Sequence, residues 1–317
     1  MSDATQPIAS PSGGADRRDV VNAHQPFRTD RLVLWAVTIA IAANFAWICA
    51  NNENFGWPVV AKYFFDPTVI SGLYVSLGLT VVAMVIGVVL GLLLAIARLS
   101  TDRLANTLAS LFIWFFRGTP LLVQLIFWYN LSTLFPRLSL NIPFGPTLAS
   151  WDTNSVITPM TAAIVGLALN EAAYMAEIIR GGLLSVDRGQ AETAEAFGMT
   201  RARALRRIII PQAMRSIVPP TGNQLISMIK ATSLVSVIAM ADLLYSVQSI
   251  YNSTFEVIPM LLVAVVWYLL ITSVLNLGQG YIERYYGRGD KRSGDNAKAA
   301  DAAPAVPSSA LAQEPSH

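Results

Sequence analysis

The feature that most constrains this chain is a series of six apolar segments, each long enough to cross a lipid bilayer. We place them at roughly 32–50, 69–97, 106–134, 157–179, 217–245 and 257–279. A helix of about 20 apolar residues spans the hydrocarbon core, where unpaired backbone groups are not tolerated. Charged residues make up only 13% of the chain, against about 25% in soluble domains. The sequence therefore predicts an all-α integral membrane protein with about six transmembrane helices.

The distribution of lysine and arginine predicts the orientation of these helices. If the N-terminus is cytoplasmic, 18 of the 22 basic residues fall on the cytoplasmic side, and only Lys62 and Arg137 fall outside. Cytoplasmic loops carry such an excess of positive charge. Both ends are therefore predicted to be cytoplasmic, and the polar stretches 1–30 and 286–317 are expected to be disordered tails.

Several kinds of chemistry are excluded by simple counts. The chain has one cysteine, Cys49, and its two histidines, His24 and His317, lie in the polar ends, so we expect no disulfide and no metal site. None of the four lysines follows a glycine, so the chain lacks the phosphate-binding loop of an ATPase. We expect a protein that is no enzyme and holds no cofactor, and a net charge of +2 gives no sign of a nucleic-acid partner.

The longest cytoplasmic connection, 180–215, has a helical rather than a linker composition. Residues Gln190 to Phe197 favour a short helix that Gly198 ends. A second helix is predicted over 201–210, capped by Thr200 and ended by Pro211, which turns the chain back toward the membrane. From periodicity alone, a helix lying on the membrane surface is an equal alternative.

This loop resembles the EAA loop of the permeases of ATP-binding-cassette importers. Glu192, Ala194, Ala196 and Gly198 are followed after nine residues by Ile208-x-Ile210-Pro211. Thr193 and Ile210 stand where the family usually has Ala and Leu. Further strings, FFRGTPLLVQ at 115–124, NEAAYMAEIIRGG at 170–182 and KATSLVSV at 230–237, resemble the polar amino-acid branch of that family.

The resemblance implies a type I importer permease in a bacterial inner membrane, with its permease domain at 67–285 and an added N-terminal helix and outer loop at 31–66. It also implies a cytoplasmic ATPase dimer that binds ATP and Mg²⁺, a second permease subunit (identical or paralogous) and an extracytoplasmic solute-binding protein, besides the lipid. The residues that would couple to the ATPase are Gly189, Gln190, Ala191, Glu192, Ala194, Glu195, Ala196, Phe197, Gly198 and Pro211.

Polar side chains inside the apolar segments are candidates for the substrate path, because unpaired polar groups are costly in lipid. The candidates are Arg117, Thr119, Gln124, Asn170, Glu171, Tyr174, Lys230, Thr232, Ser233, Ser236 and Asp242. Thr232 and Ser236 have an equal alternative role in bonding neighbouring helices. For Glu177, which the helical spacing places on the face of Asn170 and Tyr174, an interfacial ion pair with Arg180 is the favoured interpretation.

The string Arg117-Gly118-Thr119-Pro120 can be either a structural kink or a moving gate. Pro120 removes a backbone donor, and we expect Arg117 or Thr119 to bond the freed carbonyls.

Two other functions are weighed against the importer. A stand-alone transporter driven by an ion gradient would use Asp242 as its membrane carboxylate, but the sequence contains no internal repeat. A membrane enzyme would need a converging catalytic set, and the apolar segments contain no histidine or paired carboxylates.

Overall fold

The computed structural model describes residues 29–142 and 147–286, and the chain divides into two compact units, Met1–Glu53 and Asn54–His317. The first unit contains helix α2 (Thr29–Asn51), which is long and apolar enough to cross a membrane. The predicted disorder of 1–30 and 286–317 falls almost wholly outside the described residues.

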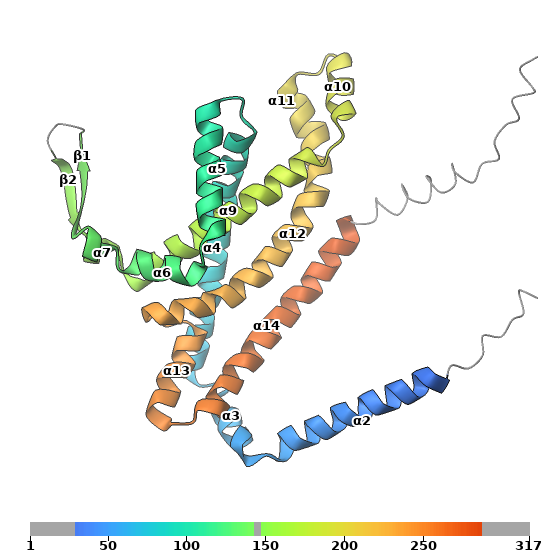
Figure 1. The fold of residues 1–317 in the computed structure, drawn as a ribbon, viewed down its shortest axis with the longest axis vertical. Coiled ribbons are helices and arrows are strands. Elements are labelled where there is room, and N and C mark those ends of the chain that lie inside the picture. The colour runs from blue at the N-terminus through green and yellow to red at the C-terminus, as the bar shows by residue number, and fades with distance from the viewer. Residues whose placement is uncertain (1–28, 143–146, 287–317) are drawn as a thin grey trace, which may run out of the picture. The chain divides into compact units, whose positions relative to one another are not determined.

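The second unit is built from helices that run past one another (Figure 1). In chain order its elements are a 3-10 turn (Glu53–Phe55, shared with the first unit), α3 (Trp57–Tyr63), α4 (Pro67–Leu99), α5 (Arg103–Gly118), α6 (Leu121–Tyr129), α7 (Leu131–Leu134), β1 (Arg137–Asn141), β2 (Thr147–Asp152), α8 (Thr153–Val156), α9 (Pro159–Leu184), α10 (Arg188–Ala196), α11 (Arg201–Ala204), a π-helix (Leu205–Ile209), α12 (Ile210–Ala231), a 3-10 helix (Thr232–Ile238), α13 (Leu243–Thr254) and α14 (Val257–Tyr286).

Four of the predicted apolar segments form continuous helices: α2, α4, α9 and α14. The other two are broken within the described chain. Helices α5 and α6 meet at 103°, and the helix that ends at Ile238 meets α13 at 46°. Counting each bent pair as one span gives the six crossings that the sequence predicts.

Helices α4 and α9 form the closest helix pair, and small residues make the approach possible. A Cβ atom on Gly87 of α4 would lie 2.7 Å from Cγ of Glu171, and one on Gly91 would lie 2.6 Å from Cβ of Met175. On the α9 side, Ala172 and Ala176 are fully buried. Small residues four apart let two helix backbones come close in a membrane, where packing rather than the hydrophobic effect drives association.

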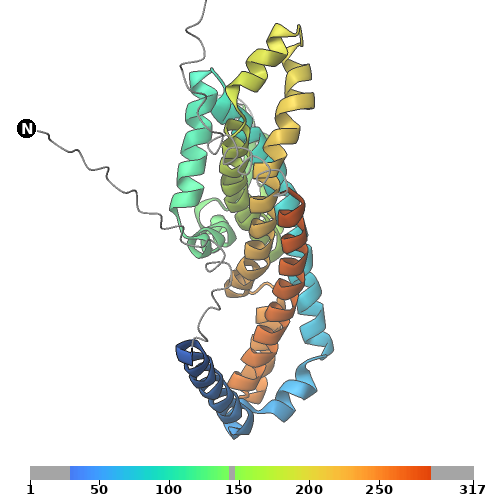
Figure 2. The ribbon, with the colours of Figure 1, turned by 90° about the vertical axis from the view of Figure 1, so that its right-hand side faces the viewer.

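The buried side chains form two main clusters on either side of this pair. One joins α4 and α6 to α9 through Leu79, Leu125 and Leu167. The other joins the start of α4 to α13 and α14 through Leu73 and Val247. Figure 2 shows α4, α12 and α14 running along the long dimension of this unit.

Pro211 does not end a helix, which corrects one expectation from the sequence. The chain is helical from Arg201 through the π-helix into α12, and Pro211 lies in the first turn of α12. The N–H of Ile210 bonds the carbonyl of Leu205, five residues back. Such a widened turn gives room for the proline ring, which would clash with a carbonyl in a regular α-helix.

A second difference is the antiparallel hairpin of β1 and β2, which the sequence analysis did not predict. It pairs Arg137 with Asp152 and Leu138 with Trp151. It precedes α9, whereas α10 follows α9, so one membrane crossing separates the hairpin from α10 (Figure 1).

The α4–α9 contact predicts unequal effects of two glycine substitutions on the same helix. Gly91→Leu should destabilise the protein by about 1–3 kcal/mol, as overpacking does, because its Cβ would also lie 3.0 Å from the Ala172 carbonyl oxygen. Gly78→Leu is the control, since no atom lies within 4 Å of its Cβ position. The thermal unfolding midpoint in detergent measures the effect, and equal midpoints for the two variants would contradict the packing described here.

Candidate functional site

Helix α10 is the short helix that the sequence predicts in the cytoplasmic loop, and both of its ends are capped. Oδ1 of Asp187 accepts a hydrogen bond of 2.7 Å from the Gly189 N–H at its start. At its end the N–H of Gly198 bonds the Glu195 carbonyl at 2.9 Å, and the N–H of Met199 bonds the Ala194 carbonyl at 3.0 Å. These two bonds form a Schellman cap, which requires the positive φ of 72° that Gly198 adopts.

The prediction that Gly198 ends the helix is therefore confirmed. The start was predicted two residues too late, at Gln190, because the sequence analysis did not recognise Asp187 as an N-cap.

The residues proposed to couple to an ATPase lie together on this helix, except Pro211. Among them only Ala194 is buried, whereas Phe197 is 83% exposed. A large aromatic side chain held in solvent by a capped helix is suited to filling a pocket on another protein. Pro211 lies on the first turn of α12, apart from the rest.

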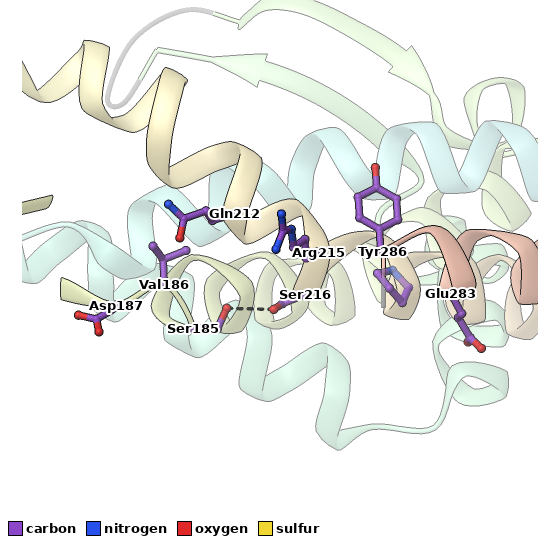
Figure 3. Close-up of a pocket in the computed structure, with 9 residues that line it drawn as sticks. Ser185, Val186, Asp187, Gln212, Arg215, Ser216, Glu283 and Tyr286 are labelled. Atoms are coloured by element: carbon purple, nitrogen blue, oxygen red, sulfur yellow. Dashed lines mark hydrogen bonds between the residues drawn. The ribbon is translucent and has the colours of Figure 1, made fainter. Parts of the chain in front are cut away.

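Two side-chain hydrogen bonds join the α10 region to α12. Nε2 of Gln212 donates to Oε1 of Gln190 at 3.2 Å, and Oγ of Ser185 donates to Oγ of Ser216 at 3.0 Å. Between them lies a polar hollow of about 500 Å³ that the end of α14 also lines (Figure 3). A displacement of α10 is therefore passed to α12 through these bonds as well as through the chain.

Another contact joins α12 to α14. Nε2 of Gln279 donates to the Pro219 carbonyl at 2.8 Å, and its side chain packs on Gly222. Sequence reasoning missed Ser185, Gln212, Ser216 and Gln279, because polar residues at helix ends carry no periodic signal.

The bend between α5 and α6 is held by amide side chains from two elements. Pro120 lacks the N–H that would bond the Phe116 carbonyl in a continuous helix. Nε2 of Gln124 donates to that carbonyl at 3.0 Å, and Nδ2 of Asn170 on α9 donates to it at 3.0 Å. Gln124 also bonds the Thr119 carbonyl at 3.1 Å.

The expectation that Thr119 bonds a nearby carbonyl is confirmed, since its hydroxyl donates to the Phe115 carbonyl at 2.8 Å. Arg117 does not take that role. Its guanidinium lies over the ring of Tyr174, with Cζ 5.3 Å from the ring centroid, a cation–π contact between two exposed side chains.

Further along α9, two acidic residues have contrasting surroundings. Glu177 pairs with Arg180 at 2.7 Å, which confirms the expected ion pair. Glu171 is 4% exposed and packs on Gly87, and its Oε1 atom has no hydrogen-bond partner among the described residues.

The polar residues of the fifth segment bond mainly within it. The hydroxyls of Thr232, Ser233 and Ser236 donate to the carbonyls of Ile229, Lys230 and Ser233, at 2.8, 2.7 and 2.9 Å. Lys230 is exposed in the last turn of α12 and forms no salt bridge with any described residue.

Asp242 is fully buried and caps α13. Its carboxylate accepts from the N–H groups of Tyr245 at 2.9 Å and Leu244 at 3.2 Å, and Oη of Tyr268 donates to it at 3.4 Å. The structure therefore gives Asp242 a capping role and does not bring it to Lys230. No group of three His, Cys, Asp or Glu side chains within the described ranges is arranged to hold a metal ion.

Comparison with known proteins follows the same pattern. The profile of the family described as binding-protein-dependent transport system inner membrane component matches residues 87–287. The chain is 42% identical to the arginine transport system permease protein ArgU of Corynebacterium glutamicum, over 92% of this chain and 90% of that protein. It is 36% identical to the L-cystine transport system permease protein TcyB of Bacillus subtilis, over 73% of this chain and 92% of that one.

Solved structures give a further match. A crystal structure of an amino acid ABC transporter with histidines aligns with a TM-score of 0.60 and 38% identity, over 71% of this chain and 97% of that chain.

The bonds at the α5–α6 bend predict a larger effect for a buried amide than for an exposed one. Gln124→Ala should destabilise the protein by about 1–3 kcal/mol, because it removes donors from buried carbonyls. Asn130→Ala, whose Nδ2 donates to the exposed Ile126 carbonyl at 2.8 Å, should change stability little. Thermal unfolding in detergent measures both.

The partner amide on α9 extends this test. Asn170→Ala combined with Gln124→Ala should be non-additive, since both amides donate to the Phe116 carbonyl. Strictly additive effects would show that the two amides act independently.

Proposed function

Because this chain belongs to the family of binding-protein-dependent transport system inner membrane components, we propose that α10 is the helix through which an ATPase drives it. The chain is a permease subunit of an ATP-binding-cassette importer for amino acids, a transport component of the inner membrane. The observation that carries the coupling proposal is the exposed Phe197 beside the Gly198 cap.

Partner subunits complete the proposed transporter. Two cytoplasmic ATPases bind ATP and Mg²⁺ and contact the α10 helices of two permease subunits, which are identical or paralogous. A solute-binding protein delivers cargo on the opposite face. In support, none of the lysines follows a glycine, so the nucleotide-binding loop must belong to another chain.

We further propose that both termini lie in the cytoplasm. The support is the placement of 18 of the 22 basic residues on that side, with α10 among them. The β1–β2 hairpin then lies on the outer face, one crossing of α9 away from α10.

The cargo is proposed to be a polar amino acid or a close relative. The permeases that this chain resembles serve arginine, L-cystine and glutamine. Among the candidate path residues, Arg117, Tyr174 and Lys230 are exposed and free to meet a carboxylate or an ammonium group. Gln124, Asn170 and Asp242 are engaged with backbone groups and act as supports of the path.

The alternative of a stand-alone transporter driven by an ion gradient is set aside. The family membership supports an importer that works with an ATPase. The carboxylate that such a transporter would use, Asp242, caps α13.

Phe197 provides a direct test of ATPase docking. Phe197→Ala should reduce the amount of ATPase that co-purifies with the tagged chain about tenfold or more, because an aromatic anchor contributes about 2 kcal/mol or more to such an interface. Phe255→Ala is the matched control, since Phe255 is 86% exposed and lies beyond α13. Undiminished co-purification with Phe197→Ala would remove α10 as the docking helix.

Gly198 provides a graded test of coupling. Gly198→Val should uncouple ATP hydrolysis from uptake while the chain still inserts, because a β-branched residue at φ 72° costs about 1–2 kcal/mol or more. Gly198→Asn should have a smaller effect, since Asn tolerates this conformation. Uptake and substrate-stimulated ATPase activity in vesicles are the measurements. Normal values of both for Gly198→Val would contradict the coupling assignment.

A further inference from the structure

An apolar groove of about 690 Å³ lies among α4, α9, α12 and α14, at the end of these helices nearest to α10. Its walls carry long aliphatic side chains such as Leu92, Ile179 and Met214. Thr221 supplies the only side-chain hydroxyl in the lining, and that hydroxyl donates to the Ile217 carbonyl at 2.8 Å. The groove therefore offers no free polar group to an amino-acid cargo.

One end of this groove meets a cluster of arginines. Leu205 and Ile210, which bound the π-helix and its junction with α12, line the groove. Arg206 and Arg207 lie between them in sequence and, with Arg203, line a neighbouring hollow of about 350 Å³. None of the three guanidinium groups forms a salt bridge with a described residue. Three like charges around one hollow repel each other unless an anion lies between them.

We propose that the groove and the arginine hollow together form a binding site for one anionic phospholipid. An acyl chain lies along the groove, and the phosphate is bound by Arg203, Arg206 and Arg207. Guanidinium groups bind phosphate oxygens through paired, charge-assisted hydrogen bonds, and basic residues beside an apolar surface are attracted to anionic lipids.

Charge and size favour a lipid over a protein occupant. A helix from a second copy is about 10–12 Å across with its side chains and would need more room than a groove enclosed by four helices provides. It would also leave the arginines without an anion. A phospholipid satisfies both features at once, since it joins a long apolar chain to a negative headgroup.

The position of the site connects it to the coupling region. The π-helix that carries Arg206 and Arg207 lies between α10 and the body of α12. A lipid held there contacts α4, α9 and α14 through its chain and the coupling end of α12 through its phosphate.

The experiment uses the full chain alone in detergent, so that its outcome does not depend on the proposed ATPase. Native mass spectrometry follows the binding of phosphatidylglycerol and, separately, of phosphatidylcholine with the same acyl chains. We expect phosphatidylglycerol to be retained more strongly. R203Q/R206Q/R207Q should weaken its retention about tenfold or more, whereas R203K/R206K/R207K should largely preserve it.

Two further variants separate the groove from general basic charge. Leu92→Trp narrows the groove and should reduce retention of both lipids, and Arg103→Gln, an exposed arginine at the start of α5, should change neither. Equal retention of phosphatidylglycerol by the wild type and R203Q/R206Q/R207Q would overturn the proposal.

Protein occupants give different results. If Leu92→Cys in a Cys49→Ser background cross-links two copies and no lipid is retained, the groove is an interface between permeases. If R203Q/R206Q/R207Q keeps its lipid but loses a co-purifying ATPase from native membranes, the arginines bind that protein instead. Either result overturns the lipid site.

Discussion

A backbone carbonyl inside a lipid bilayer needs a donor, because no water is present to replace a lost helical bond. The third span of this permease breaks at Pro120, and the carbonyl of Phe116 loses its helical partner there. Gln124 and Asn170 supply two replacement donors, one from α6 and one from α9. The 103° turn is thus possible only where α9 lies alongside, and α9 can lie there because Gly87 and Gly91 let it approach α4.

The second break follows the same rule with different groups. The chain leaves α12 through a 3-10 helix, reverses its backbone at Ala239 with φ 56°, and begins α13 at the carboxylate of Asp242. Ser76 of α4 accepts a further bond from the Leu243 N–H at 3.0 Å. Both broken spans therefore depend on side chains of α4 or α9, which makes this helix pair the frame of the permease.

The sequence predicted much of this architecture because long apolar runs have few alternatives in lipid. The four unbroken spans and the end of α10 at Gly198 follow from length, composition and one glycine. The angle at Pro120 does not follow, since it depends on Asn170, 50 residues away along the chain. Pro211 was misjudged because a π turn, which no local pattern announces, lets a helix continue through it. The hairpin was missed because its two short strands lie between long apolar runs that dominate the hydropathy signal.

The π-helix between Leu205 and Ile209 has a geometric consequence for the motion of α10. A π turn is equivalent to one residue inserted into an α-helix, and one residue corresponds to about 100° of azimuth. If this turn migrates along the helix or is absorbed, the segment before it revolves about the α12 axis while the segment after it stays in place. Only the few hydrogen bonds of that turn exchange partners. Such a screw-like adjustment would let α10 change its bearing on the ATPase without unfolding the span.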